Sequence, residues 1–298
     1  MTKFYQHHLN QVSRSFAICT PKLQQPLREW ISLTYLLCRI LDTVEDSHWT
    51  NKEDQDLQFS QFLELTTSSQ TPALFIKKWV QRFPSSLPES EKELVKETPL
   101  LLKNLHHTIP LPIKQHILNL LEQMTLGMKI FSQKPISNLR ELNKYCYYVA
   151  GIVGETLHHF LVFCSPELNQ PSFFKKACEF GLFLQKINIL KDQQKDEKEG
   201  RHFIPNRKEV LSSLSSHAQK AFSYIKSLPS KHQDFRLFCS ISLFLGLSSL
   251  PYIQNSFHLK EQIKISRAQT FKLIQALEEN ISQPAFMEHL FQESLTHL

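Results

Sequence analysis

Carboxylate side chains gather in two short stretches of this 298-residue sequence. The first, "LDTVED", places Asp42, Glu45 and Asp46 directly after the apolar run "WISLTYLLCRI". On a helix, residues three, four and seven positions apart lie on one face, so Tyr35 and Arg39 share a polar stripe with these carboxylates. Such a stripe is also typical of the solvated face of an amphipathic helix. The first stretch alone therefore leaves a functional site and a surface helix both open.

The second stretch, "GLFLQKINILKDQQKDEKEGRHFIP", places Gln185, Asn188, Asp192 and Asp196 on one helical face, and apolar residues occupy much of the rest. Unpaired carboxylates cost much free energy when they are buried, whereas a divalent cation can hold several of them together. Oxygen ligands without Cys or His select Mg²⁺ or Mn²⁺ rather than zinc. Two acidic helices therefore favour a magnesium site.

The predicted metal indicates the kind of ligand. Proteins usually hold Mg²⁺ with a few carboxylates together with substrate phosphates. The sequence has no glycine-rich P-loop or dinucleotide fingerprint, which argues against a nucleoside triphosphate. Phe-rich helices around the acidic stretches suit an apolar tail, so the predicted substrate is a diphosphate ester of an apolar group.

The elements that must position these side chains are predicted to be helices. Only 6 Gly stand against 22 Phe, and apolar residues recur with a helical period, with almost no alternating runs. Prolines mark most of the predicted helix boundaries, and about ten helices are expected. The prolines placed where helices could begin are Pro26, Pro72, Pro112, Pro171 and Pro284. We expect an all-α fold and one domain over residues 1–298.

The charge and the cysteines of the sequence indicate its possible partners and its cellular compartment. The balance of 34 Lys+Arg against 28 Asp+Glu gives +6, which suits an anionic substrate or a membrane surface as well as nucleic acid. The six cysteines stand singly in apolar segments without metal-ligand spacing, which indicates reduced core residues and a cytoplasmic protein. The N-terminus has no signal-peptide pattern, and "LFCSISLFLGLSSLPYI" is predicted to be a buried core helix rather than a membrane span.

Several motifs together resemble the squalene and phytoene synthase family, in the family's order. They are "NQVSRSFA", "YLLCRILDTVED", "YCYYVAGIVGETL", "GLFLQKINILKDQQKDEKEGRHFIP", "LFCSI" and "KISRAQT". The stretch of residues 48–137 carries no motif that we match to the family.

The resemblance implies a single-domain, all-α isoprenoid-synthase bundle with a central cavity, across which the two acidic motifs face each other. It implies that Mg²⁺ (or Mn²⁺) holds the diphosphates of two farnesyl diphosphate molecules. Loss of one diphosphate leaves an allylic cation that alkylates the second molecule, and proton loss gives presqualene diphosphate. The squalene-forming branch, which the chain resembles most, then ionises this intermediate and reduces it with NADPH to squalene. No nucleic-acid partner is expected.

The resemblance also implies a role for individual residues. The metal ligands would be Asp42, Glu45, Asp46, Asp192 and Asp196. The catalytic residues would be Tyr145, Tyr35 and Phe238. The substrate would contact Ser13, Arg14, Ser15, Phe16, Arg39, Gln185, Asn188 and Arg201. The NADPH phosphates would contact Arg14, Arg39, Lys191 and Lys264.

Simpler explanations stay open for several of these residues. "SRSF" alone is typical of a helix cap, and Phe238 is a possible core residue. "YCYYVAG" also indicates aromatic packing, with Ala150, Gly151 and Gly154 allowing a close approach of helices. Isolated surface lysines are usually solvated.

Departures from the family pattern leave alternative functions. Ser242 and Leu243 replace a Pro-Gln pair, Ser266 replaces a basic residue, and Tyr147 stands where histidine is frequent. A dehydrosqualene, presqualene diphosphate or phytoene synthase without NADPH use is the first alternative. A non-catalytic assembly or scaffold member is the second, although it should have lost some of the acidic residues. Without the C-terminal anchor of eukaryotic relatives, we expect a soluble protein or one peripheral to the membrane.

Overall fold

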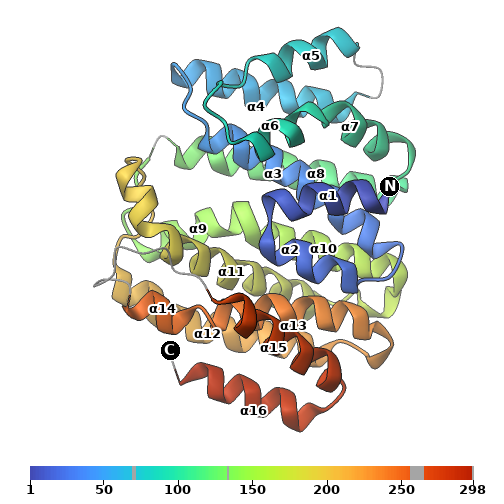
Figure 1. Ribbon diagram of the computed structural model, residues 1–298, viewed down its shortest axis with the longest axis vertical. Coiled ribbons are helices and arrows are strands. Elements are labelled where there is room, and N and C mark those ends of the chain that lie inside the picture. The colour runs from blue at the N-terminus through green and yellow to red at the C-terminus, as the bar shows by residue number, and fades with distance from the viewer. Residues whose placement is uncertain (69–71, 133, 256–264, 297–298) are drawn as a thin grey trace. The chain divides into compact units, whose positions relative to one another are not determined.

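The structure is a computed structural model that describes residues 1–68, 72–132, 134–255 and 265–296, and these residues form helices and no strand (Figure 1). The prediction of an all-α fold is confirmed. The chain divides into two compact units, each described here by itself. The N-terminal unit comprises residues 1–133 and 159–166, and the C-terminal unit comprises residues 134–158 and 167–298.

Helix α3 (Leu27–Asp46) is the central helix of the N-terminal unit, and it packs against α1, α4, α6, α7 and α8. The end of α10 also belongs to this unit. The other helices of the unit are α1 (Thr2–Val12), α2 (Arg14–Cys19), η1 (Thr20–Lys22), α4 (Lys52–Thr67), α5 (Ala73–Gln81), α6 (Glu89–Lys96), α7 (Thr98–His107) and α8 (Leu111–Phe131).

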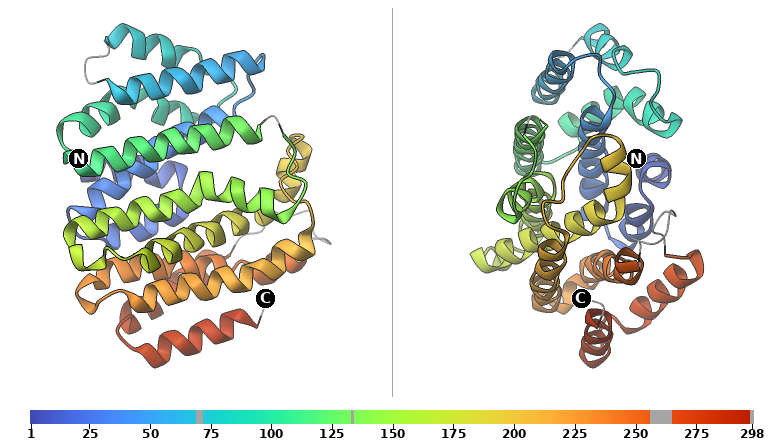
Figure 2. Two further views of the ribbon diagram at one scale, coloured as in Figure 1. Left: turned by 180° about the vertical axis from the view of Figure 1, so that it is seen from behind. Right: turned by 90° about the vertical axis from the view of Figure 1, so that its left-hand side faces the viewer.

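Helix α11 (Pro171–Lys198) has the same central place in the C-terminal unit, where it runs alongside α12 and also packs against α9, η2, α13 and α14 (Figure 2). The other helices of this unit are α9 (Leu139–Cys146), the π-helix η2 (Tyr147–Gly151), the start of α10 (Ile152–Cys164), η3 (Pro166–Leu168), α12 (Arg207–Ser227), η4 (Ser230–His232), α13 (Gln233–Leu247), α14 (Leu250–Asn255), α15 (Arg267–Asn280) and α16 (Pro284–Leu295).

The predicted proline starts are confirmed at all five positions. Pro26 and Pro72 directly precede α3 and α5, and Pro112, Pro171 and Pro284 occupy the first two positions of α8, α11 and α16. Proline is tolerated there because the first N–H groups of a helix have no partner within the helix. The helices outnumber the expected ten because several are short, between six and ten residues long.

Small residues let α11 approach the "YCYYVAG" segment closely, as the sequence predicts. A Cβ atom added to Gly181 would lie 2.1 Å from the carbonyl oxygen of Ala150, and one added to Gly154 would lie 2.1 Å from that of Ala177. Real Cβ contacts are never so short, so backbone meets backbone at both places. This contact joins the π-helix to the helix that carries the second acidic motif. π-Helical turns of this kind are frequent at functional sites.

Replacing Gly181 by Ala is expected to reduce the free energy of unfolding by about 3 kcal/mol, because the obstacle is backbone and cannot rotate away. Denaturant unfolding measures the change. Gly246→Ala is the matched control, since its new methyl group would meet the ring of Phe183 at 2.9 Å, and a ring can shift. Equal losses in the two variants would contradict the close backbone approach as the cause.

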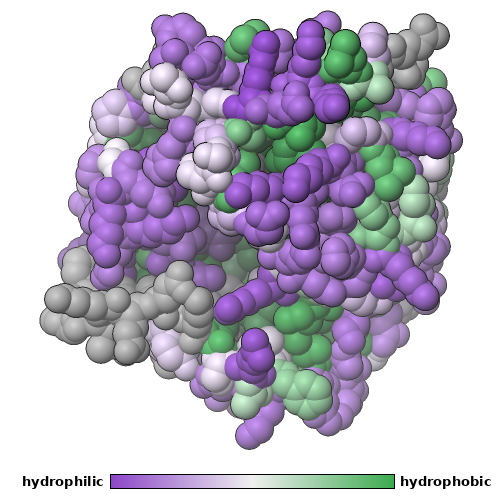
Figure 3. All heavy atoms as spheres, turned by 45° about the horizontal axis from the view of Figure 1, so that its top comes forward, coloured by the Kyte–Doolittle hydropathy of each residue, from purple (hydrophilic) through white to green (hydrophobic). Residues whose placement is uncertain are grey.

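The surface that Figure 3 shows is mostly hydrophilic, with small apolar patches between polar side chains. Among the described residues, one helical stretch, Ser230–Gln254, is long and apolar enough to cross a membrane, and 72% of its apolar window is buried. That burial agrees with the prediction of a core helix. Four of the six cysteines are buried as expected, whereas Cys178 is half-buried and Cys164 is exposed. The expectation of six core cysteines was therefore wrong for Cys164, which lies at the end of α10.

Candidate active site

The predicted polar stripe is present on α3. From residue 35 to residue 46, the residues that are not fully buried are Tyr35, Arg39, Asp42, Glu45 and Asp46, and all the others are buried. Burial of every intervening residue follows from the central place of α3, which is covered by neighbouring helices on its other sides. The first acidic motif is therefore part of one polar, partly exposed seam on an otherwise buried helix.

The "SRSF" motif lies against this seam. Ser13 caps α2 by accepting a hydrogen bond from the Phe16 amide at 3.2 Å, which confirms the helix-cap interpretation. Phe16 stacks on Tyr35 with 4.1 Å between the ring centroids. Burial raises the pKa of Tyr35 to about 12, against the lowering effects of a hydrogen bond with Ser13 and of Arg39. Tyr35 is therefore a neutral phenol at physiological pH. Arg14 and Ser15 are exposed beside this cluster.

Arg39 connects this seam to α6, for which the sequence predicted no role. Its guanidinium lies 2.5 Å from Glu91 in α6 and 3.9 Å from Asp42. No motif pointed to Glu91, because the pair is separated by 52 residues and forms only when α6 packs on α3. Burial raises the pKa of Asp42 to about 7, with Arg39 acting to lower it and Asp46 and Glu91 to raise it. A cation beside Asp42 would favour its charged form.

The second predicted seam is present on α11. Gln185 is half-buried, Asn188 and Asp192 are exposed, and Asp196 is buried. The Asp196 carboxylate is paired with the Arg201 guanidinium at 2.9 Å, and the Asp196 carbonyl accepts the Arg201 amide at 2.8 Å. The turn after α11 thus folds back on the second acidic motif. Both acidic motifs occupy the last turns of the central helices of their units.

A chain of contacts connects this turn to Tyr145. Tyr145 is buried and stacks on Phe203 with 5.0 Å between the ring centroids. The Arg201 guanidinium lies 6.0 Å from the centroid of the same Phe203 ring. "YCYYVAG" and "GRHFIP" are therefore brought together in the C-terminal unit. Phe203 was not predicted as a site residue, although it lies in the second acidic motif.

Phe238, Lys191, Lys264 and Ser266 were also singled out in the sequence. Phe238 is buried in α13, 5.8 Å from the Phe235 ring in centroid distance. Lys191 is half-buried on α11. Lys264 lies outside the described residues. Ser266, which replaces a basic residue of the family, caps α15 in a reciprocal capping box with Gln269.

A buried polar network in the C-terminal unit was not predicted. Lys186 is fully buried on α11 and donates at 2.8 Å to Ser213 and to Nε2 of His217. Because an ammonium group only donates, the other ring nitrogen of His217 donates to Glu179 at 2.5 Å. Glu179 also accepts from Lys220 at 2.8 Å. Burial lowers the pKa of Lys186 to about 8, and the His217 hydrogen bond lowers that of Glu179 to about 2.

The donor atoms of the two acidic motifs suit a magnesium ion. Across the part of the chain that the structure describes, no three His, Cys, Asp or Glu side chains lie close enough together to hold a metal ion. Each acidic motif nevertheless presents oxygen donors outside the core, since the Asp42 side chain is 35% exposed and Asp192 is exposed. Carboxylate oxygens without Cys or His suit Mg²⁺, so the residues present fit that ion.

Comparison with known proteins places these motifs in a family. The family model for squalene/phytoene synthase matches residues 9–213. The squalene synthase of Bos taurus is 26% identical over 97% of this chain and 72% of its own length. The squalene synthase of Schizosaccharomyces pombe is 27% identical over 89% of this chain and 63% of its own length. The chain thus spans about two thirds of the length of these relatives.

Solved structures show the same fold. The structure of TcSQS with the ligand BPH1237 superimposes with a TM-score of 0.78 and 22% identity over 99% of this chain and 98% of that chain. A dehydrosqualene synthase in complex with a ligand gives a TM-score of 0.64 and 16% identity over 94% of this chain and 96% of that chain.

Proposed function

The chain belongs to the squalene/phytoene synthase family, and from this premise we propose that it is a prenyltransferase of the squalene synthase type. It would condense two farnesyl diphosphate molecules head to head to presqualene diphosphate and reduce that intermediate with NADPH to squalene. We further propose that residues 1–298 act as one catalytic domain with a central substrate cavity. One observation carries the proposal: each acidic motif forms a polar seam at the end of the central helix of its unit.

The proposed metal ligands are Asp42, Glu45 and Asp46 on α3 and Asp192 and Asp196 on α11. When bound, Mg²⁺ would neutralise negative charge on the diphosphate groups and so ease their departure.

The residues around the first seam would bind and orient the diphosphates. Arg39 already stands between two carboxylates, and its charge would attract a phosphate. Ser13 and Arg14 lie beside it at the start of α2. Ser15 and Phe16 complete the same motif, and Tyr35 would present a neutral hydroxyl.

Residues of the C-terminal unit would act on the prenyl part of the substrate. Gln185 and Asn188 would contact substrate, and Arg201, which is paired with Asp196, would also bind phosphate. Tyr145 would assist the loss of a proton or steady the cation with its hydroxyl. Phe238 would offer an aromatic face to the cation.

For reduction, NADPH would supply the hydride. The proposed phosphate contacts are Arg14, Arg39, Lys191 and Lys264, of which the last lies outside the described residues. Scattered cations can hold phosphates without a glycine-rich turn. We also propose a cytoplasmic protein that contacts the membrane peripherally, because its product would be an oily hydrocarbon.

A second candidate function has its own supporting observation. Ser266 caps α15 and supplies no cation where the family has a basic residue, which weakens the proposed NADPH site. Production of presqualene diphosphate, dehydrosqualene or phytoene without NADPH is therefore the alternative. A non-catalytic scaffold role is disfavoured, because all five acidic residues are retained.

Product analysis tests the proposal. The purified protein is incubated with farnesyl diphosphate and Mg²⁺, with and without NADPH, and the lipids are separated by chromatography and mass spectrometry. We expect squalene with NADPH, and presqualene diphosphate or dehydrosqualene-like or hydroxylated products without it. Identical products in both reactions would decide for the alternative enzyme, and no prenyl product in either would favour the scaffold role.

A further inference from the structure

The last turn of α3, which carries the first acidic motif, is an unfavourable helix end. Asp42, Glu45 and Asp46 all lie where the helix dipole is negative, and the turn contains no basic residue. The following residue, Ser47, is extended with φ −73° and ψ 144°, so no left-handed cap closes the helix. The final carbonyl groups of a helix lack partners within the helix. This turn should therefore fray unless other groups hold it.

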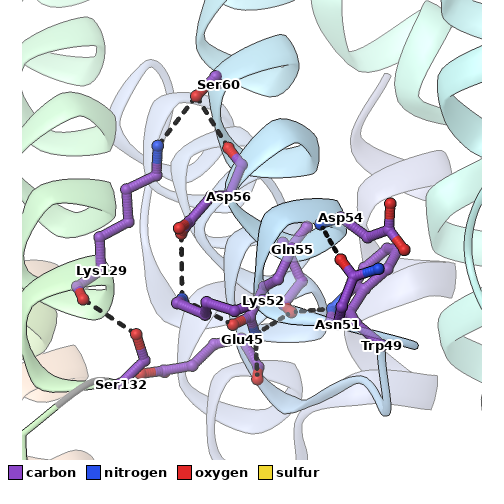
Figure 4. Close-up of polar contacts among 11 residues, drawn as sticks. Glu45, Trp49, Asn51, Lys52, Asp54, Gln55, Asp56, Ser60, Lys129 and Ser132 are labelled. Carbon is purple, nitrogen blue, oxygen red and sulfur yellow. Dashed lines mark hydrogen bonds and ion pairs between the residues drawn. The ribbon is translucent and has the colours of Figure 1, made fainter.

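Side chains from the next segment supply the missing donors (Figure 4). The Gln55 amide donates to the carbonyl of Val44 at 3.1 Å and to that of Glu45 at 2.9 Å. The Trp49 indole donates to the Val44 carbonyl at 2.7 Å. Ser47 donates its hydroxyl to the Thr43 carbonyl. Three consecutive carbonyl groups at the acidic end are thus satisfied by side chains.

The Gln55 amide is itself held in one orientation. Lys52 donates at 2.9 Å to the amide oxygen of Gln55 and is paired with Asp56 at 3.0 Å. Because the Lys52 ammonium can only donate, the amide NH₂ must point the other way, towards the end of α3. Gln55 is 9% exposed, so solvent competes little for these bonds. Lys129 of α8 donates to the Ser60 hydroxyl of α4 at 2.9 Å, and Figure 4 shows this contact on the same helix as Gln55.

We propose that Gln55, supported by Trp49 and Lys52, is a positioning residue that keeps the acidic end of α3 helical before any ligand binds. The proposal rests on the proposed function, in which Asp42, Glu45 and Asp46 bind metal. Carboxylates on a frayed turn would have to be ordered when the metal arrives, and that ordering would weaken binding. Because the side-chain hydrogen bonds of Gln55 form during folding, the end of α3 is already ordered when the metal binds.

Hydrogen–deuterium exchange of the intact, metal-free protein tests the proposal directly. In Gln55→Ala, the segment Asp42–Ser47 is expected to exchange about tenfold faster, because two hydrogen bonds to its carbonyl groups are lost. Gln58→Ala is the matched control: Gln58 is a buried glutamine of the same helix, but it donates to the carbonyl of Trp79 instead. That control should leave the exchange of the segment Asp42–Ser47 unchanged.

Gln55→Glu separates hydrogen bonding from packing, because it keeps the side-chain size and a partner for Lys52 while removing both N–H donors. It too should exchange faster at the helix end. Binding of Mn²⁺ with inorganic pyrophosphate, followed by the electron paramagnetic resonance of free Mn²⁺, should weaken about tenfold in Gln55→Ala, which adds no charge, and stay unchanged in Gln58→Ala.

The outcomes distinguish this proposal from the proposed function. Wild-type exchange in both Gln55 variants would overturn the positioning role and leave the prenyltransferase proposal standing. Faster exchange with unchanged Mn²⁺ affinity would show that Gln55 caps the helix without serving the metal site, which also overturns the proposal. Faster exchange and weaker Mn²⁺ binding support it, whether or not the wild-type protein forms a prenyl product.

Discussion

Turnover of farnesyl diphosphate is expected to fall by at least roughly a hundredfold in Asp42→Asn and in Asp192→Asn, because each change removes a charge from the proposed metal site. The fold should be retained. The Asp42 side chain is 35% exposed and its contact with Arg39 is long, at 3.9 Å, while Asp192 is exposed. Steady-state kinetics and denaturant unfolding, measured on the same preparations, check both parts.

Exposed acidic residues other than the five proposed metal ligands provide the controls. Asp54→Asn lies on α4 and Glu197→Gln lies on α11, and neither belongs to a proposed site. Each removes one negative charge, so a general effect of charge would appear in them as well. Both should keep turnover close to that of the wild type. Activity within tenfold of wild type in both Asp42→Asn and Asp192→Asn would rule out a site built from the two motifs.

Tyr145→Phe is expected to slow formation of the first product roughly a hundredfold, while substrate binding changes little, because a phenol that acts on a proton or a cation works in the transition state. The substitution keeps the ring that stacks on Phe203, so the local packing should survive. Single-turnover kinetics separate the chemical step from binding.

Tyr148→Phe serves as the control in the same segment. Tyr148 is half-buried in the π-helix and contacts the Tyr147 ring edge-on, with 5.8 Å between the ring centroids. Loss of its hydroxyl should have a mild effect. An unchanged turnover number in Tyr145→Phe would assign that residue to aromatic packing, the simpler explanation that its sequence motif leaves open.

The helices and their polar faces could be predicted from the sequence because they depend on residues close together in the chain. A helical period places Arg39 and Asp42 on one face whatever the helix packs against. Proline starts a helix through its own backbone, so Pro171 marked the start of α11 correctly. Chain order also placed Gly154 in a segment suited to close packing, and Gly154 lies against α11.

The partners of these faces were decided by the tertiary structure. Glu91 and Arg39 are 52 residues apart in the sequence, and His217 and Lys186 are 31 apart. No local sequence pattern therefore predicts either pair. From the sequence alone, a lysine on an apolar helix is expected to be solvated. Lys186 is instead fully buried, because α12 supplies its hydrogen-bond partners. Gln55 has no signature either, since any amide could donate to a carbonyl. The sequence alone thus determined which helices form and which faces are polar, through local periodicity. Only the packing of distant segments decided which buried polar groups meet, because hydrogen bonds and ion pairs depend on distances in space that local order does not encode.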